Sequence, residues 1–302
     1  MHCSKQIVLL LSVLCGGCSM HPLPEDVTPL NTYQIVQKIR CEVRDSLGLF
    51  VIGAIKDSDP DIAADLKSGK RKFASVESKH LTPNGRAILQ RYEKSALAYE
   101  FVFDMTENNT AGGNIGVASI LSRGPLTFTA SAGAAKTRRN KRNFRIVDSF
   151  GRLLRTLPDR ICDNIEKGEN AAYPITGTIG MTEVLKTFLD LNQSGNLSGA
   201  QIPTLAETLE FTTRLDVAAG GGVKLEALGR RTRVSDAALS ASAYREDKHN
   251  LTITLSLPMP GENDRPATIF EKRAFDELER QRILEIDDED VRARRALINL
   301  VE

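Results

Sequence analysis

Apolar residues follow two different spacings along the chain. In the first, they recur every four positions, at Ile35, Ile39, Val43 and Leu47. This spacing marks the buried face of a helix over residues 32–47, with Thr32 as its N-cap. Further helices are predicted over 85–96 and 182–191. From Leu97 onward, apolar residues alternate with polar ones, which predicts half-buried strands.

The alternating stretches predict two antiparallel meanders of about four strands each. The first covers 97–147 and contains a turn-forming stretch over 107–113. Alternation returns over 209–217, and a second Gly-rich turn is predicted over 218–222. A helix precedes each meander, so we interpret the two halves as an internal duplication. The alternative is that Gly, Ser and Ala are common enough in strands and turns to imitate a repeat.

These elements predict an α+β fold of two related helix-plus-meander units with a C-terminal helical tail. The predicted divisions are a signal peptide over 1–17, a tether over 18–31, a first unit over 32–166, a second unit over 167–261 and a charged helical tail over 262–302. Several prolines predict an extended tether. We expect an exposed excursion over 57–72 and a helix broken near Pro158. The tail should form a helix from Ala267 and a shorter one after the acidic residues 287–290.

The N-terminus has the features of a bacterial export signal. Lys5 precedes an apolar run over 7–14, which is too short for a membrane-spanning helix but has the length of a signal-peptide core. Residues 14–19 (LCGGCS) resemble the lipobox of bacterial lipoproteins, and this resemblance implies cleavage before Cys18 and a lipid on that cysteine. Ser19 resembles the outer-membrane sorting pattern. The alternatives are cleavage without lipid and an uncleaved short anchor.

A lipid on Cys18 predicts a protein of the bacterial cell envelope, on the periplasmic face of the outer membrane. The membrane, reached through this N-terminal lipid, is then its first partner. The stretches PLPEDVT and KIRCEVRD, together with the two predicted sheets, are similar to uncharacterised lipoproteins of proteobacteria. The resemblance is specific at the leader and implies no activity.

Two cysteines remain once the leader and the lipidated residue are set aside. They are Cys41 and Cys162. Because the periplasm is oxidising, we predict a Cys41–Cys162 disulfide with a structural role. The alternative is a pair of buried free thiols that behave as small hydrophobic side chains.

The mature chain is formally neutral, since removal of Lys5 leaves 39 of the 40 basic residues against 39 acidic ones. A balanced charge gives no global field for nucleic acid, and the absence of Trp with a low aromatic content argues against a stacking platform. Six cations nevertheless gather in one short stretch: Lys136, Arg138, Arg139, Lys141, Arg142 and Arg145. We predict contact with an anionic envelope component or an envelope protein. The alternative is a solvated hairpin tip that discourages aggregation.

The sequence contains none of the catalytic motifs that we considered. A nucleophile elbow, a phosphate-binding loop and a dinucleotide motif are absent, and the histidines of the mature chain lack metal-ligand spacing. Residues 190–201 resemble a calcium loop but end in Gln201 where a Glu is required. We therefore expect no catalytic residue, cofactor or metal ion, and predict a binding or structural role. The alternatives are a periplasmic hydrolase with a dispersed site and an accessory subunit of an envelope secretion or transport complex.

Overall fold

A computed structural model describes residues 21–121, 124–163, 168–193, 204–223, 232–258, 261–262 and 264–298. The predicted signal peptide and Cys18 lie outside these residues. The chain forms two compact units, which we name the sheet unit (Met1–Val27, Asp104–Lys141 and Thr213–Asp247) and the helical unit (Thr28–Phe103, Arg142–Thr212 and Lys248–Glu302).

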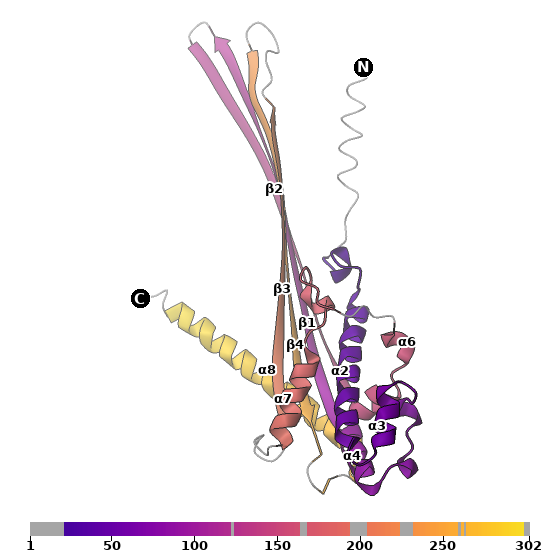
Figure 1. Cartoon of the computed structure of the whole chain (residues 1–302). Helices are drawn as coiled ribbons and strands as arrows, with labels where there is room; N and C mark the ends of the chain where they lie inside the picture. The colour runs from indigo at the N-terminus through magenta and orange to yellow at the C-terminus, as the bar shows by residue number, and fades with distance from the viewer. Residues whose placement is uncertain are drawn as a thin grey trace. The chain divides into compact units, whose positions relative to one another are not determined.

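One four-stranded antiparallel sheet contains all the strands of the described residues (Figure 1). The strands are β1 (Ala96–Leu121), β2 (Gly124–Ser149), β3 (Thr204–Val223) and β4 (Thr232–Ser256). Their order is β2-β1-β4-β3, so two hairpins meet along β1 and β4, and the edges are β2 and β3. The predicted α+β class is confirmed.

Each half of the chain contains one hairpin of long strands where the sequence predicted about four shorter ones. The turn predicted over 107–113 lies inside β1, and the one predicted over 218–222 lies inside β3. Within β1, Gly112 has a packing role that does not require a turn. A Cβ on this residue would come within 3.1 Å of the Ser240 hydroxyl on β4, so the missing side chain permits close cross-strand contact.

The helices before the first hairpin are α2 (Thr32–Ile55), α3 (Pro60–Lys67) and α4 (Pro83–Lys94). Between and after the hairpins lie α5 (Phe150–Arg155), α6 (Asp159–Cys162), α7 (Met181–Gln193) and α8 (Ala267–Ile298). Short 3-10 turns occur at η1 (Pro24–Asp26), η2 (Phe73–Ser75), η3 (Ser78–His80) and η4 (Pro174–Thr176). None of the helices in the described part of the chain has the length and apolar character needed to cross a membrane.

Three local predictions need correction. The N-cap of α2 is Asn31, not Thr32, because the Asn31 side chain accepts a hydrogen bond from the Gln34 amide at 3.0 Å. The region predicted as an exposed excursion contains α3, whose buried Ile62 and Leu66 pack inward. The predicted tail forms one continuous helix, α8, and the acidic residues 287–290 lie inside it rather than at the start of a second helix.

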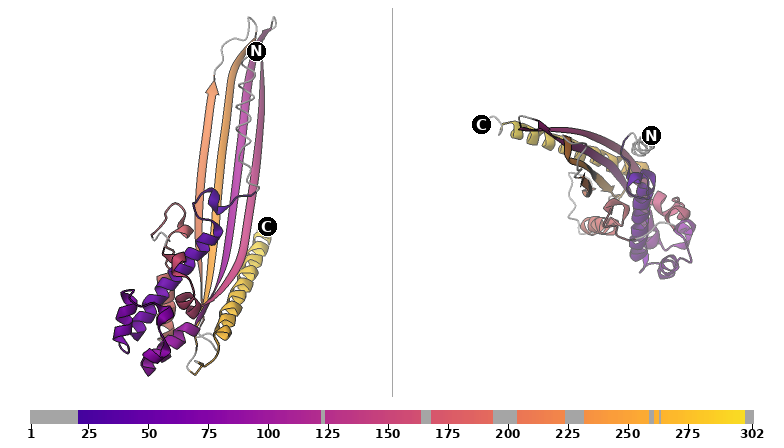
Figure 2. Two further views of the ribbon diagram at one scale, coloured as in Figure 1. Left: turned by 90° about the vertical axis from the view of Figure 1, so that its right-hand side faces the viewer. Right: turned by 90° about the horizontal axis from the view of Figure 1, so that it is seen from above.

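The helical unit places helices on both faces of its part of the sheet. Ala96 and Ala98 of β1 form a buried cluster with residues of α8, namely Phe270, Ala274 and Leu278. The alternate residues Tyr99, Phe101 and Phe103 are fully buried and point to the opposite face. In Figure 2, α2 and α8 lie on opposite sides of the strands. Burial of each Phe ring contributes about 1.5–3 kcal/mol.

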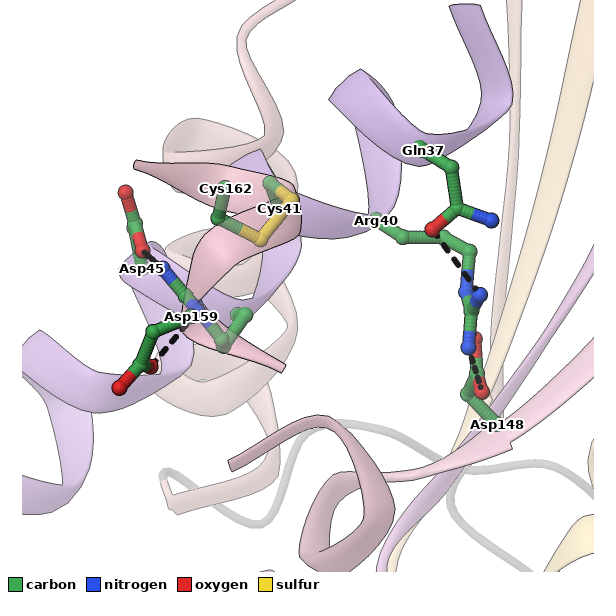
Figure 3. The surroundings of a disulfide bond; sticks show 8 residues. Gln37, Arg40, Cys41, Asp45, Asp148, Asp159 and Cys162 are labelled. Atoms are coloured by element: carbon green, nitrogen blue, oxygen red, sulfur yellow. Dashed lines mark hydrogen bonds and ion pairs between the residues drawn. A yellow bond between two sulfur atoms is a disulfide. The ribbon is translucent and has the colours of Figure 1, made fainter. Parts of the chain in front are cut away.

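A disulfide pair connects α2 to α6, as the sequence predicted. The Cα atoms of Cys41 and Cys162 are 5.5 Å apart, within the usual range for a disulfide, and 121 positions separate them in the chain (Figure 3). Near it, the Arg40 guanidinium donates two hydrogen bonds of 2.8 Å to the Asp148 carboxylate. This two-pronged contact, which we name the Arg40–Asp148 fork, joins α2 to the end of β2.

We expect reduction of the Cys41–Cys162 bond to lower the free energy of unfolding by about 2–5 kcal/mol, because a long loop is released in the unfolded chain. Urea unfolding of the protein from membrane fractions, with and without dithiothreitol, measures this change. A Cys41→Ser/Cys162→Ser variant is the control and should not respond to the reductant. Equal stability of the oxidised and reduced wild type would contradict a stabilising bond.

Candidate functional site

The buried side chains of the sheet unit are mostly polar or proline. Among its described residues they are Pro22, Pro24, Met105, Thr213, Arg245 and Asp247. The helical unit, in contrast, has a continuous apolar core. The sheet unit therefore depends on polar contacts, and the densest group of these is its candidate functional site.

Arg245 and Asp247 form a buried ion pair at the centre of this site. They are two residues apart on β4, so both side chains point to the same face. Arg245 Nε lies 2.9 Å from Asp247 Oδ1, and its Nη2 lies 2.9 Å from Oδ2. The side chains are 9% and 1% exposed, so the two-pronged geometry offsets much of the cost of removing both charges from water.

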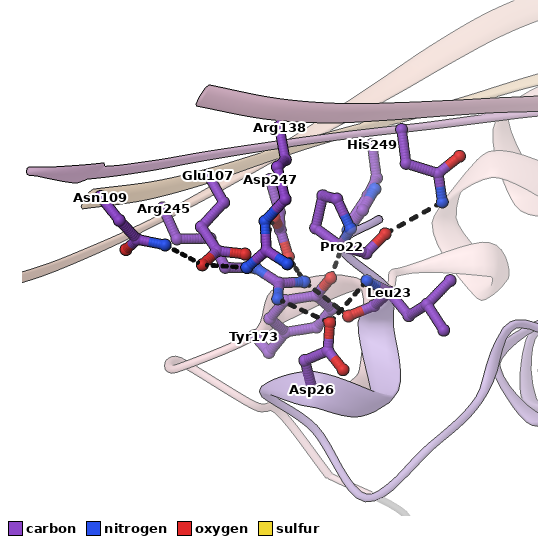
Figure 4. Close-up of polar contacts among 11 residues, drawn as sticks. Pro22, Leu23, Asp26, Glu107, Asn109, Arg138, Tyr173, Arg245, Asp247 and His249 are labelled. Atoms are coloured by element: carbon purple, nitrogen blue, oxygen red, sulfur yellow. Dashed lines mark hydrogen bonds and ion pairs between the residues drawn. The ribbon is translucent and has the colours of Figure 1, made fainter. Parts of the chain in front are cut away.

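The same guanidinium holds the N-terminal segment against the sheet (Figure 4). Arg245 Nη2 donates to the Leu23 carbonyl at 2.6 Å, and Nη1 lies 3.3 Å from Asp26 Oδ2. Asn140 of β2 donates to the Pro22 carbonyl at 2.9 Å. Residues 22–26 are thus docked on β2 and β4 and include η1, which corrects the expectation of an extended tether for this part.

Glu107 and Arg138 complete the group that we name the Arg245 cluster: Asp26, Glu107, Arg138, Arg245 and Asp247. Arg138 Nη2 donates to Glu107 Oε1 at 2.7 Å. Desolvation alone would raise the pKa of Glu107, but hydrogen bonds from Asn109 and Arg138 outweigh it and hold the pKa below its ordinary value. Glu107 is therefore a carboxylate that the folded chain stabilises in its charged form.

A groove of about 340 Å³ lies beside the cluster within the sheet unit. Leu215 and Val217 of β3 line it and are 42% and 64% exposed. Both guanidinium groups of the cluster already have carboxylate partners, at Glu107 and Asp247. The chemistry therefore suits docking of the N-terminal segment and contact with an apolar side chain rather than capture of a free anion.

The predicted basic stretch lies in the middle of β2 and not at a hairpin tip. Four of its arginines have internal partners: Arg138 pairs with Glu107, Arg139 with Asp104, and Arg145 with Glu100, while Arg142 donates to the Thr32 hydroxyl. Lys136 and Lys141 are exposed and make no ion pair with the residues that the structure describes. Two of the six basic residues in this stretch, both lysines, are therefore without an ion-pair partner among the described residues.

The sequence analysis did not identify Arg245 and Asp247 as site residues. The available signal was the alternation of Arg245, Asp247 and His249, which places all three on one face of β4. All three are buried. In the helical unit, His249 lies 2.6 Å from the Tyr173 hydroxyl and packs beside the Phe103 ring.

Over the described ranges, no group of three or more His, Cys, Asp and Glu side chains is placed to hold a metal ion. A larger groove of about 870 Å³ lies in the helical unit, lined by α2, the 66–74 segment and the 154–163 segment. Three of its charged side chains form one group, in which Arg44 lies 3.3 Å from Asp159 and Asp159 also pairs with Lys72.

An Arg245→Met variant should lose about 3–5 kcal/mol of unfolding free energy, because Asp247 would keep its buried charge without the guanidinium. A double Arg245→Met/Asp247→Leu variant should recover most of that loss. The control is Arg214→Met, since Arg214 is 63% exposed and its pair with Glu246 is worth at most about 1 kcal/mol. Urea unfolding gives the free energies, and equal losses at Arg245 and Arg214 would contradict the assigned role.

The lowered pKa of Glu107 predicts a pH-dependent contribution to stability. The ionised group stabilises the fold above its ordinary pKa of about 4.3, and this contribution disappears as the pH falls through the folded value. The gap in unfolding free energy between wild type and Glu107→Gln should therefore be largest above about pH 5 and should shrink toward pH 3. A constant gap over this range would show that the charge of Glu107 has no such role.

Residues 21–298 match the family described as "Uncharacterised protein y4kA". The uncharacterized protein y4kA of Sinorhizobium fredii (strain NBRC 101917 / NGR234) is 32% identical over 269 residues, which are 84% of this chain and 82% of the relative.

Solved structures give only weak similarity. The type IV competence pilus secretin PilQ of V. cholerae aligns with a TM-score of 0.22 at 6% identity, over 55% of this chain and 61% of PilQ. A chain of the Klebsiella pneumoniae type II secretion system outer membrane complex aligns with a TM-score of 0.20 at 9% identity, over 74% and 52% of the two chains. TM-scores this low do not establish a common fold. The family match, in contrast, covers almost the whole described chain, and this protein belongs to the family described as uncharacterised protein y4kA.

Proposed function

We propose that this protein is a lipid-anchored component of the bacterial envelope with a binding or structural role, and that its sheet unit makes the contacts. The observation that supports this proposal is the docking of residues 22–26 on β2 and β4 through Arg245 and Asn140. Because residues 22–26 are held on the sheet unit and are close to Cys18 in sequence, a lipid on Cys18 would limit how far the sheet unit can move from the membrane.

Only residues 19–21 separate the predicted lipidation site from the docked Pro22. An extended chain covers at most about 3.6 Å per residue, so Pro22 would stay within roughly 14 Å of Cys18. The Arg245 cluster would then hold part of the sheet unit at the membrane surface. A short connection of this kind raises the effective concentration of the sheet unit for partners in the same membrane.

The exposed surface of the sheet unit supports a role in binding. Residues 131–137, 214–220 and 240–243 are exposed, and many of them are Ala, Gly, Ser or Thr. A sheet with little apolar burial is marginally stable by itself, so contact with another molecule would stabilise these strands. A binding partner therefore explains the exposed strands better than a solvent-facing role does.

An accessory subunit of an envelope secretion or transport complex is the second candidate function. Apolar side chains on the second half of α8 favour it: Ile283, Leu284, Ile286 and Val291 are between 44% and 58% exposed. The first half of α8 buries Phe270, Ala274 and Leu278 against the sheet. The helix thus has an intramolecular half and a half whose apolar residues are available to a protein partner.

The anchor predicts that protein from membrane fractions begins at Cys18 and carries the added mass of acyl chains. Intact mass spectrometry measures this, and a Cys18→Ser variant should lose both the acyl mass and membrane retention. The matched control is Cys15→Ser, which changes the neighbouring cysteine and should leave the lipid in place. Recovery of unmodified full-length wild type from the soluble fraction would overturn the proposal.

A further inference from the structure

The two edges of the sheet are long and carry opposite charges. Strands β2 and β3 each have a neighbour on one side only, so the other side presents a row of backbone N–H and C=O groups. Such a row pairs readily with another strand unless charge, proline or a covering segment prevents it. The charged residues of the edge strands therefore decide which strand can approach.

Strand β2 is basic along its middle, and strand β3 is acidic. The free cations of β2 are the exposed Lys136 and Lys141, which have no ion-pair partner in the described part of the chain. Strand β3 carries Glu207, Glu210 and Asp216, and none of these makes an ion pair with a described residue. Its cation Arg214 already pairs with Glu246. Each edge thus has the charges that the other lacks.

Strand direction permits the two edges to pair. Along the order β2-β1-β4-β3, each strand is antiparallel to its neighbour, so β2 and β3 run in opposite directions. A β2 strand placed beside the β3 of another copy therefore continues the antiparallel pattern. We propose that β2 of one copy pairs with β3 of a second copy, and that Lys141 faces Asp216 of β3.

Alternation within the sheet unit puts opposite charges on the same face. Arg139 contacts Asp104, and Lys141 is two residues from Arg139, so Lys141 shares the face of Asp104. Thr110 contacts Ser242, which gives even-numbered residues of β1 and β4 a common face. Arg214 contacts Glu246, so Asp216 lies on that face as well. Lys141 of one copy and Asp216 of the next can therefore form cross-strand pairs.

The charges also exclude the symmetric alternatives. Pairing of β2 with β2 would bring lysines together, and pairing of β3 with β3 would bring carboxylates together, and both contacts are unfavourable. The contact is therefore head-to-tail, and every copy that joins presents one free β2 edge and one free β3 edge. Assemblies larger than a dimer follow. This inference goes beyond the envelope role and does not depend on a lipid at Cys18.

Charge reversal on each edge tests the contact, with sedimentation velocity of the full chain in detergent as the readout. One variant is Lys141→Glu, and the other is Asp216→Lys. Wild type should sediment as assemblies, and each variant alone should dissociate, with a dissociation constant raised more than about tenfold. An equal mixture of the two variants should assemble again, because the acidic β2 of one fits the basic β3 of the other.

The control for net charge is Lys67→Glu, which reverses one exposed lysine of the helical unit and should assemble as wild type does. Circular dichroism checks the fold, and if a reversal reduces strand content, the neutral variant Lys141→Gln or Asp216→Asn replaces it. The proposal is overturned if wild type stays monomeric, if both reversed variants assemble like wild type, or if the mixture fails to reassemble.

Discussion

The sheet unit has almost no apolar core among its described residues, and the buried Arg245–Asp247 pair is the interaction on which its local geometry depends. In the helical unit, rings of β1 such as Phe101 and Phe103 are fully buried. In the sheet unit, Met105 is the one buried apolar side chain other than proline among the described residues. A buried ion pair is weak evidence for net stability, but it fixes geometry strictly because either charge alone is costly. Here that geometry includes the N-terminal segment, which Arg245 holds at Leu23 and Asp26.

The two units therefore obtain their order from different interactions. The helical unit has a packed core, the Cys41–Cys162 bond and the Arg40–Asp148 fork, which together tie α2, α6 and β2. The sheet unit has hydrogen bonds between strands, a polar cluster and exposed small side chains. Such a unit gains stability mainly from what it contacts, which supports the proposed role in binding and the proposed assembly through its edges.

Much of the helical unit could be predicted from sequence, because apolar spacing reports burial directly. The repeat at Ile35, Ile39, Val43 and Leu47 marked α2, and the two remaining cysteines indicated the disulfide pair. Strand length could not be predicted in the same way. Gly- and Asn-rich stretches favour turns locally, but pairing with neighbouring strands keeps 107–113 extended. The Arg245 cluster was missed because its members come from 26, 107, 138, 245 and 247, and only the fold brings these positions together.

We infer that the edge strands of the sheet unit are stabilised by other copies of the chain. Hydrogen–deuterium exchange at two protein concentrations tests it most directly. Backbone amides of β2 and β3 within 131–141 and 213–220 should exchange slowly in the concentrated protein and faster after dilution. Amides of α2 should exchange at the same rate in both samples. Edge-strand exchange that does not change with concentration would contradict the account.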